Sequence, residues 1–253
     1  MSNVKIDVLI PAIDKDLTVL PQVIDGIRKN VLHPIGDIYI VSPNSPRIKE
    51  MCKQKDCHFV LEDTILPVNK NNLYGAGWML QQLLKLSCDK ICSNDHFLIV
   101  DADTIFIAPH VFMYGEKTVF YCADFYWDCK PIFDHFKRLT RLKPVAHRSL
   151  INHSMFFSRT YLSELKNWIE SIHAKPWYQA IIDTIDNKAY VPFSEYETYG
   201  NFMLIKHPEN VFLARSKNLD RRIKDFQEFG TYDLDELAKR YNSISFHSRP
   251  GGQ

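Results

Sequence analysis

Hydrophobic and polar residues follow two different periods along the amino-terminal part of the chain. Short apolar runs bounded by proline, glycine or polar residues are typical of buried strands, whereas apolar residues three and four positions apart are typical of helices. The runs predict strands over 4–10, 37–42, 57–62 and 96–100. The spaced residues predict helices over 17–31, 46–52 and 76–87. Repeated strand–helix–strand units favour a mostly parallel sheet flanked by helices, so the predicted fold class is α/β.

The rest of the chain is less regular. Strands are predicted over 118–123 and 153–158, and the second of these leads into a helix whose apolar residues share one face. The segment 124–150 between them is rich in aromatic and basic residues and poor in periodicity, and we interpret it as a candidate substrate lid. No internal repeat, low-complexity tract or linker divides the chain, so we expect one domain.

Composition and charge narrow the classes of function. The 31 basic and 30 acidic residues give a net charge of +1, so the overall balance does not favour nucleic acid as a partner. The apolar run at the amino terminus is too short for a signal peptide, and no stretch approaches the roughly 18 apolar residues of a membrane span. We therefore expect a cytoplasmic protein whose six cysteines are reduced thiols.

The stretch FLIVDADTIF places two aspartates directly after a predicted buried strand. Asp101 and Asp103 are costly to bury in ionised form unless a cation or several hydrogen-bond donors meet them. Ligands of parallel sheets gather at the carboxyl ends of the strands, which is where this pair falls. One interpretation is therefore that the two carboxylates hold Mn²⁺ or Mg²⁺, which neutralises the diphosphate of a nucleotide sugar.

Two other interpretations of this pair stay open. In haloacid dehalogenase-like phosphohydrolases, an aspartate in the position of Asp101 is the nucleophile and the second aspartate is the acid or base. Such enzymes normally begin with the nucleophile strand, whereas here about a hundred residues precede it, and the later pair Asp183 and Asp186 is explained by an exposed helix face. The third interpretation is structural, with both aspartates capping a turn.

Several stretches together resemble GT-A-fold glycosyltransferases, and more narrowly bacterial sugar transferases for surface polysaccharide or lipopolysaccharide. The resemblance is carried, in the expected order, by VLIPAID, GWMLQQLLKL, FLIVDADTIF, PFSEYETYGNF and SISFHSRPGG. It implies a Rossmann-like single domain over 1–253, with a nucleotide-binding half at 1–105 and an acceptor-binding half at 106–253. The implied activity is metal-dependent transfer of a sugar from a nucleotide-sugar donor to a hydroxyl of a glycan or lipid-linked glycan acceptor.

The resemblance also implies donor contacts in the amino-terminal half. Pro11 and Ala12 would lie against the base or ribose, and Asp14 would accept a hydrogen bond from it. Gln81 or Gln82 would contact the donor or its diphosphate. The competing interpretations are an ordinary loop after a buried strand for the first three residues and a solvated helix face for the two glutamines.

Near the carboxyl terminus, the resemblance implies that His247 completes the metal site and that Arg249 binds the diphosphate. An incidental histidine is the alternative. The basic run over 137–148 would meet an anionic glycan or lipid phosphates, giving a possible peripheral membrane contact at the inner face, although a solvated helix face explains it equally. A nucleotide-sugar-binding module without turnover is a further class of function.

The stretch SEYETYGNF bears on catalysis. Ser194 and Glu197 match a capping box, in which the serine accepts from a helical amide while the glutamate reaches back to the serine amide. This would leave Glu195 free to point into the cleft. Inverting transfer needs a carboxylate that takes the acceptor's proton. We therefore predict Glu195 as the base and Glu197 as the fallback, with a helix cap lacking any catalytic role as the alternative.

Overall fold

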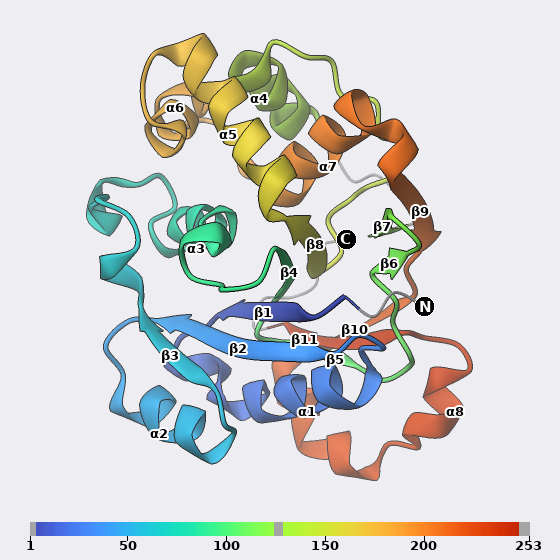
Figure 1. Ribbon diagram of the computed structural model, residues 1–253. Coiled ribbons are helices and arrows are strands. Elements are labelled where there is room, and N and C mark those ends of the chain that lie inside the picture. Colours follow the sequence, from blue (N-terminus) through green and yellow to red (C-terminus); the bar gives the residue numbers. More distant parts are fainter. Residues whose placement is uncertain (1–3, 124–128, 248–253) are drawn as a thin grey trace.

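The computed structural model describes residues 4–123 and 129–247. Its central sheet has the strand order β3-β2-β1-β4-β8. The strands are β1 (Ile6–Pro11), β2 (Ile35–Ser42), β3 (His58–Leu61), β4 (His96–Val100) and β8 (Ser154–Ser158). Neighbouring strands run parallel except for β8, which is antiparallel to β4 (Figure 1). The predicted α/β class with a mostly parallel sheet is confirmed.

Helices cover both faces of this sheet (Figure 1). On one face lie α1 (Leu20–Asn30) and α2 (Pro46–Gln54). The other face carries α3 (Gly77–Leu86), α4 (Lys130–Thr140), α5 (Arg159–His173), α6 (Trp177–Thr184) and α7 (Glu195–Lys206). Successive strand side chains point to opposite faces, so Val8 and Ile10 pack with α1 and α2 while Leu9 packs with the larger helical layer.

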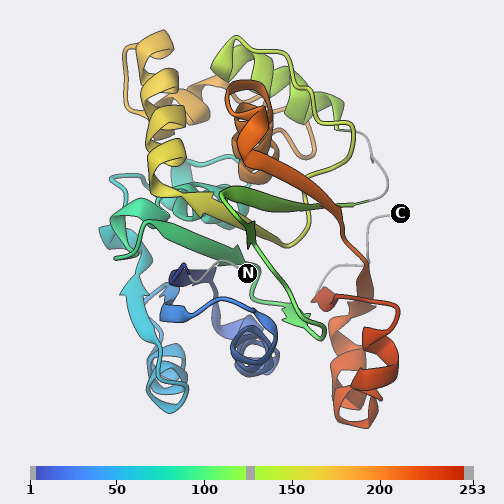
Figure 2. The ribbon, with the colours of Figure 1, turned by 45° about the vertical axis from the view of Figure 1, so that its right-hand side comes forward.

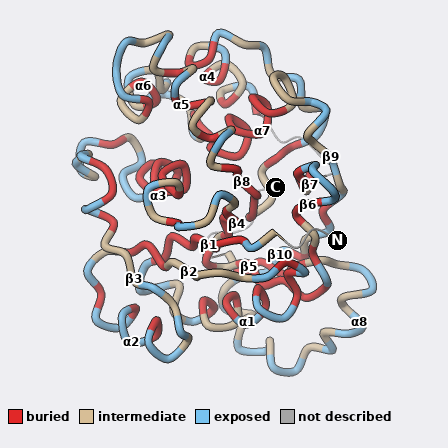
Figure 3. Tube along the Cα trace, in the orientation of Figure 1, coloured by how far each residue is buried: buried red, intermediate tan, exposed pale blue. Residues whose placement is uncertain are grey.

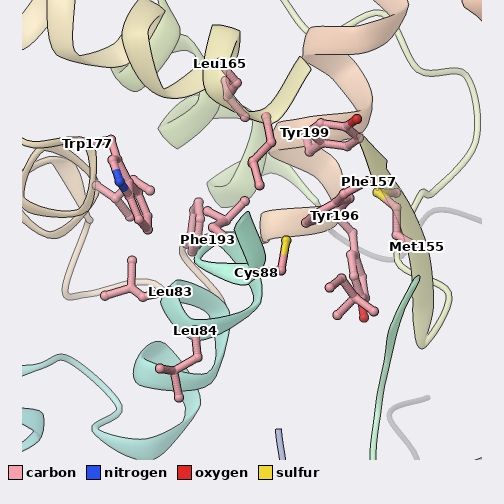
Figure 4. Packing of buried hydrophobic residues seen from close by; sticks show 14 of the residues in the cluster. Leu83, Leu84, Cys88, Met155, Phe157, Leu165, Trp177, Phe193, Tyr196 and Tyr199 are labelled. Carbon is pink, nitrogen blue, oxygen red and sulfur yellow. The ribbon is translucent and has the colours of Figure 1, made fainter. Parts of the chain in front are cut away.

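The larger layer contains the most extensive apolar core. Figure 4 shows Phe157 and Met155 of β8 beside Tyr196 and Tyr199 of α7. Figure 3 shows buried residues concentrated along β1, β4 and α3. The chain leaves this core at the carboxyl end of β4, where Asp101 follows four strand residues that are each 0% exposed.

Two small sheets complete the fold. One has the order β10-β11-β5, from β10 (Asn218–Arg222), β11 (Ser243–His247) and β5 (Thr104–Phe106), and the other the order β6-β7-β9, from β6 (Met113–Tyr114), β7 (Lys117–Cys122) and β9 (Val211–Arg215). The chain between β10 and β11, which includes α8 (Leu234–Ala238), lies on the same side as α1 (Figure 2). Short 3-10 helices lie at Asp14–Thr18, Glu62–Thr64, Lys70–Asn72, Cys88–Lys90, Pro208–Asn210 and Ile223–Thr231.

The expectation for segment 124–150 is wrong in one respect. Residues 124–128 lie outside the described part of the chain, but α4 occupies much of the rest and buries Ile132, Phe136 and Leu139. The proline that follows Lys130 stands in the first turn, where its missing N–H is harmless. Periodicity is therefore present in this segment, and the helix belongs to the core.

Two other expectations concern the chain as a whole. The six cysteines are free thiols, and five of them are buried. Burial raises the pKa of the Cys52 thiol to about 11, which keeps it protonated near neutral pH. Across the described residues, no helix is both long and apolar enough to cross a membrane.

Candidate active site

A cavity of about 630 Å³ opens at the carboxyl ends of β1 and β4. Its size lies within the range of small-molecule binding sites. The loop after β1, the start of α3, the loop after β4 and the end of β11 all contribute to its wall. Of the residues singled out from the sequence, those that line it are Pro11, Ala12, Gln81, Asp101, Asp103 and His247.

Backbone hydrogen bonds fix the loop that carries the two aspartates. The Asp101 N–H donates to the carbonyl of His153 over 2.8 Å, and the Asp103 carbonyl accepts from the N–H of Phe246 over 2.9 Å. The loop is thus joined to the start of β8 on one side and to β11 on the other. Because Phe246 immediately precedes His247, this second bond also sets the position of that histidine.

His247 lies between two carboxylates. Its Nδ1 is 3.1 Å from Asp103 Oδ2 and its Nε2 is 3.1 Å from Asp220 Oδ1. The hydrogen bonds to Asp103 and Asp220 raise the pKa of His247 to about 10, against the opposing effect of partial burial. The metal-site prediction had included His247 but not Asp220, which comes from β10 and carries no motif in the sequence.

His153 is the second imidazole at this site. Its Nδ1 is 3.4 Å from Asp101 Oδ2, its Nε2 is 4.0 Å from Asp220 Oδ1, and its ring centroid lies 5.0 Å from that of His247. The predicted metal ligands did not include His153, which stands at the head of the strand predicted over 153–158. Its backbone has a positive φ of 58°, a conformation that is uncommon for residues other than glycine.

These side chains fit a divalent cation. Ligand atoms of Asp101, Asp103 and His153 lie within 4.8 Å of one another, and so do those of His153, Asp220 and His247. Carboxylate oxygens suit Mg²⁺ and Mn²⁺, and imidazole suits transition metals. The donor set is therefore compatible with the predicted Mn²⁺ or Mg²⁺.

Lys85 is the principal residue that sequence reasoning missed. It extends from α3 to an ion pair with Asp101 Oδ1 and to a second ion pair, 2.8 Å long, with Glu195 Oε1. The hydroxyl of Tyr196 donates to Asp101 Oδ1 over 3.3 Å. Burial alone would raise the pKa of Asp101, but the Lys85 ammonium and His153 hold it well below its usual range. A lysine between Leu84 and Leu86 on the buried side of a predicted helix was the available signal.

The geometry expected for Glu195 is wrong. Its side chain is buried, at 1% exposure for the residue, and it faces Lys85 instead of opening into the cavity. Burial raises the pKa of Glu195, while the neighbouring Lys85 ammonium lowers it. The expected freedom to point into the cleft is absent because the apolar layer of α3 and α7 closes over this carboxylate.

The capping box expected at the start of α7 forms only in part. Ser194 Oγ accepts from the N–H of Glu197 over 3.2 Å, as predicted. The Glu197 carboxylate turns the other way, because Oε1 accepts from the N–H of Leu150 over 2.8 Å and Oε2 accepts from Asn201 Nδ2 over 3.0 Å. Glu197 is 0% exposed and joins α7 to the chain before β8.

Three further residues were predicted to contact the donor. Asp14 accepts a hydrogen bond from Ser45 and lies outside the cavity wall. Gln82 is 6% exposed, and its Oε1 accepts from the N–H of Glu195 over 3.5 Å. Arg249 lies outside the described residues. The charged and aromatic residues that line the cavity without having been singled out from the sequence are Lys15, Asp16, Glu62, Lys70 and Trp78.

The basic run over 137–148 does not present one free cationic patch. Lys137 forms an ion pair with Asp134 over 3.3 Å, and Arg138 donates to the carbonyl of Thr184 over 3.1 Å. Asp183 was predicted to lie on an exposed helix face. It does so on the outside of α6, where it forms an ion pair with Lys175 over 2.6 Å.

A family model matches residues 27–234 and is described as a family of unknown function, DUF6492. The chain belongs to the DUF6492 family. The match runs from the last turn of α1 to the start of α8 and includes the aspartate pair, His153 and Asp220, while His247 follows the matched region. Among curated protein sequences, none matches this member of the family.

Two crystal structures of glucosyl-3-phosphoglycerate synthase from Mycobacterium tuberculosis are similar to this chain. One, in complex with Mn²⁺, UDP and glucosyl-3-phosphoglycerate, is 17% identical, with 83% of this chain and 69% of that chain covered and a TM-score of 0.40. The other, with Mn²⁺, UDP and phosphoglyceric acid, is 16% identical, with 83% and 68% covered and a TM-score of 0.42. Similarity at this level concerns the outline of the chain and does not transfer an activity.

Proposed function

We propose that this DUF6492 protein is a divalent-cation-dependent glycosyltransferase that binds a nucleotide sugar in the 630 Å³ cavity. The observation that carries the proposal is the position of Asp101 and Asp103. They leave the carboxyl end of a central strand and reach the cavity wall, where Asp103 lies against His247 and Asp101 against His153. A cation at the edge of such a sheet is placed to meet the phosphates of a nucleotide.

In this proposal Asp101, Asp103 and His247 hold the cation. When bound, Mn²⁺ or Mg²⁺ stabilises the charge of the leaving diphosphate. The chain itself orients the donor: Pro11 and Ala12 form the wall at the end of β1, and the start of α3 contributes Gln81. Water is excluded from the side beneath the aspartates by a closely packed layer, in which Lys85 and Tyr196 are only 3% and 2% exposed.

Two lysines support an anionic ligand in this cavity. Lys15 and Lys70 both line it. Lys70 forms an ion pair with Glu62 over 3.3 Å, and its side chain remains 39% exposed. Trp78, at the first turn of α3, adds a partly buried aromatic ring to the same wall. A wall that combines cations, carboxylates and an aromatic ring suits a ligand with phosphates and a sugar or a base.

The phosphohydrolase interpretation has weaker support. It requires an oxygen of Asp101 to attack phosphorus. Oδ1 of this residue already contacts Lys85 and accepts from Tyr196, and Oδ2 faces His153. Both oxygens therefore have partners that orient the carboxylate, an arrangement that suits a ligand of a cation better than a nucleophile.

The resemblance to GT-A-fold glycosyltransferases is the support for the acceptor class and for the base. A glycan or lipid-linked glycan of a bacterial surface is the proposed acceptor class. Neither Glu195 nor Glu197 lines the cavity in this conformation, so the base role predicted for them is a hypothesis for mutagenesis.

A thermal-shift panel of UDP-, GDP- and CDP-sugars, with and without Mn²⁺, followed by a transfer or slow-hydrolysis assay, tests the proposal. We expect one donor to raise the melting temperature only with the cation, and Asp103→Asn to remove that increase. Asp183→Asn is the matched control, since this carboxylate lies on the exposed side of α6. A panel without any cation-dependent increase, or a phosphorylated Asp101, would overturn the assignment.

A further inference from the structure

His153 and His247 direct their ring nitrogens in the same sense, with ring planes inclined by 38°. Each directs Nδ1 at one aspartate of the DADT loop: His153 at Asp101 Oδ2 over 3.4 Å and His247 at Asp103 Oδ2 over 3.1 Å. Each turns Nε2 toward a single carboxylate oxygen, Oδ1 of Asp220, at 4.0 Å and 3.1 Å respectively. The five residues thus form two layers, with the aspartate pair on one side of the rings and Asp220 on the other.

The backbone builds this arrangement from four separate segments. His153 is held at a φ of 58° by the hydrogen bond from the Asp101 N–H to its carbonyl and by the bond from the Ser154 N–H to the Asn152 carbonyl, 2.7 Å long, which closes a tight turn around it. In the small sheet, β10 and β11 run parallel, with Arg222 paired to His247. Because side chains alternate along a strand, Asp220 lies on the same face as Arg222 and is a diagonal neighbour of the histidine.

Two histidine–aspartate separations suit neighbouring ligands of one ion, while the ligand atoms of His247 lie within 4.8 Å of those of His153 and Asp220 as a group. Bonds of about 2.0–2.2 Å to a six-coordinate cation place adjacent ligand atoms about 3 Å apart. The pairs His247 Nδ1–Asp103 Oδ2 and His153 Nδ1–Asp101 Oδ2 are 3.1 and 3.4 Å apart, and ligand atoms of Asp101, Asp103 and His153 lie within 4.8 Å of one another. An ion on this side faces the cavity, which both aspartates line.

We propose that the cation is bound by four residues, Asp101, Asp103, His153 and His247, through Nδ1 of both imidazoles, and that Asp220, hydrogen-bonded to His247 Nε2 over 3.1 Å, is the positioning residue for His247. This inference rests on the proposed function and extends it. A metal-bound imidazole carries its proton on the other ring nitrogen, and a carboxylate there fixes the tautomer and the ring orientation. Asp220 supplies that carboxylate and is itself oriented by Asn218 Nδ2 over 2.7 Å.

The ligand set determines which cation is preferred. Mg²⁺ favours oxygen ligands and keeps several waters, whereas imidazole nitrogen suits transition metals. Two nitrogens among four protein ligands therefore select Mn²⁺ over Mg²⁺. With two carboxylates and two neutral imidazoles, the site also leaves coordination positions for diphosphate oxygens from the cavity side.

Electron paramagnetic resonance of Mn²⁺ bound to the full chain, without nucleotide, tests this inference. We expect electron spin-echo modulation from two directly bound ¹⁴N nuclei, and Mg²⁺ in large excess should be needed to displace the manganese. His153→Gln should remove one nitrogen coupling and weaken Mn²⁺ binding at least tenfold. Asp220→Ala should keep Mn²⁺ binding but weaken it by about 10- to 100-fold, which is typical for the loss of such a partner.

The control is Asp235→Asn, an exposed carboxylate in the first turn of α8, which should leave Mn²⁺ affinity and the spin-echo spectrum unchanged. Far-UV circular dichroism and metal-free melting of each variant separate lost folding from lost binding. If the variants do not fold, the wild-type spectrum and the anomalous signal of manganese in a crystal decide alone. No ¹⁴N coupling, unchanged affinity in folded His153→Gln, or an ion beside Nε2 would overturn the inference.

This test and that of the proposed function fail separately. Binding of Mn²⁺ with two nitrogen ligands but no turnover of any nucleotide sugar supports the ligand set and removes the transferase. Cation-dependent transfer that is fully retained in His153→Gln and Asp220→Ala supports the transferase and removes the ligand set.

Discussion

Lys85 and Glu195 form a buried ion pair in which Nζ lies 2.8 Å from Oε1 and the two side chains are 3% and 2% exposed. The same ammonium contacts Asp101, so negative, positive and negative charges follow one another from the interior of the α3–α7 layer to the cavity wall. This series of charges orients the Asp101 carboxylate from the interior of the protein. It also explains why a lysine and a glutamate lie in an otherwise apolar layer, since each compensates the desolvation of the other.

Removing the ammonium should destabilise the fold. Lys85→Met leaves the buried carboxylate of Glu195 and the partly exposed carboxylate of Asp101 without their cation, and we expect the free energy of unfolding to fall by about 3–5 kcal/mol. Urea denaturation at pH 7 measures it. The control is Lys239→Met, because its pair with Glu236 is solvent-exposed, at 69% and 61% of the side chains, and should contribute at most about 1 kcal/mol. Equal losses for the two variants would refute the structural role of Lys85.

Glu195→Gln separates the structural role of this residue from the predicted base. Because the carboxylate faces Lys85 and does not line the cavity, we expect the variant to lose about 1–3 kcal/mol of stability and to retain measurable transfer. Denaturation and a transfer assay on the same preparation give both quantities. Unchanged stability with transfer abolished at normal donor affinity would instead establish Glu195 as the base.

Asp7, in the middle of the central sheet, should make stability depend on acid pH. Burial alone would raise the pKa of this carboxyl, but hydrogen bonds from the backbone of Asn94, Asp37 and Ser93 and from the Asn94 side chain lower it overall. A lowered folded pKa stabilises the fold above the unfolded value of about 3.9, and this contribution is lost as the pH falls through the folded pKa.

The corresponding variant is Asp7→Asn, whose amide group would face the same donors. We expect it to lower the free energy of unfolding by about 2–4 kcal/mol at pH 7, and the difference from the wild type to shrink below about pH 4. Denaturant titrations at both pH values measure the difference. A difference that is independent of pH would show that the ionised form is not what the donors stabilise.

His110 should produce a second pH dependence at milder acidity. Burial lowers the pKa of this imidazole to about 4, although the hydrogen bond of Nδ1 with the Ala108 carbonyl opposes the change. The unfolded chain takes up a proton at about pH 6.5 while the folded chain stays neutral, so stability falls between about pH 6.5 and pH 4.

The contribution of His110 over that range is on the order of 3 kcal/mol. Unfolding free energies of the wild type and of His110→Gln at several pH values should differ in slope, with the variant the less pH-dependent. Parallel slopes for the wild type and His110→Gln would contradict the prediction.

The strands and helices of the first half were predictable because their signals are local. Apolar residues that recur every second position in a strand, or every third to fourth position in a helix, form a pattern that depends only on near neighbours in sequence. The strand β4 was predicted at its observed bounds, His96–Val100. The position of Asp101 and Asp103 at the cavity follows from the same rule, since a strand end in a parallel sheet is a sequence feature. The helix α4 was missed because aromatic and basic residues obscured an apolar face of only three or four residues.

The partners of those aspartates were not predictable in the same way. Lys85 and His153 reach Asp101 from 16 and 52 residues away, and Asp220 reaches His247 from a neighbouring strand of the small sheet. Glu195 and Glu197 show the same limit within one helix turn: the sequence indicated a cap, but the packing of α7 against α3 and β8 directed both carboxylates inward.

The sequence by itself determined the alternation of strands and helices, the α/β class and the aspartate pair at the end of a buried strand, because each depends on interactions within a few residues. Only the tertiary structure decided that the Lys85 ammonium and the imidazoles of His153 and His247 meet that pair. It also decided which carboxylates are buried. Side-chain direction at a site depends on the packing of segments that are remote in sequence, and the free energy of that packing is not written in any local pattern.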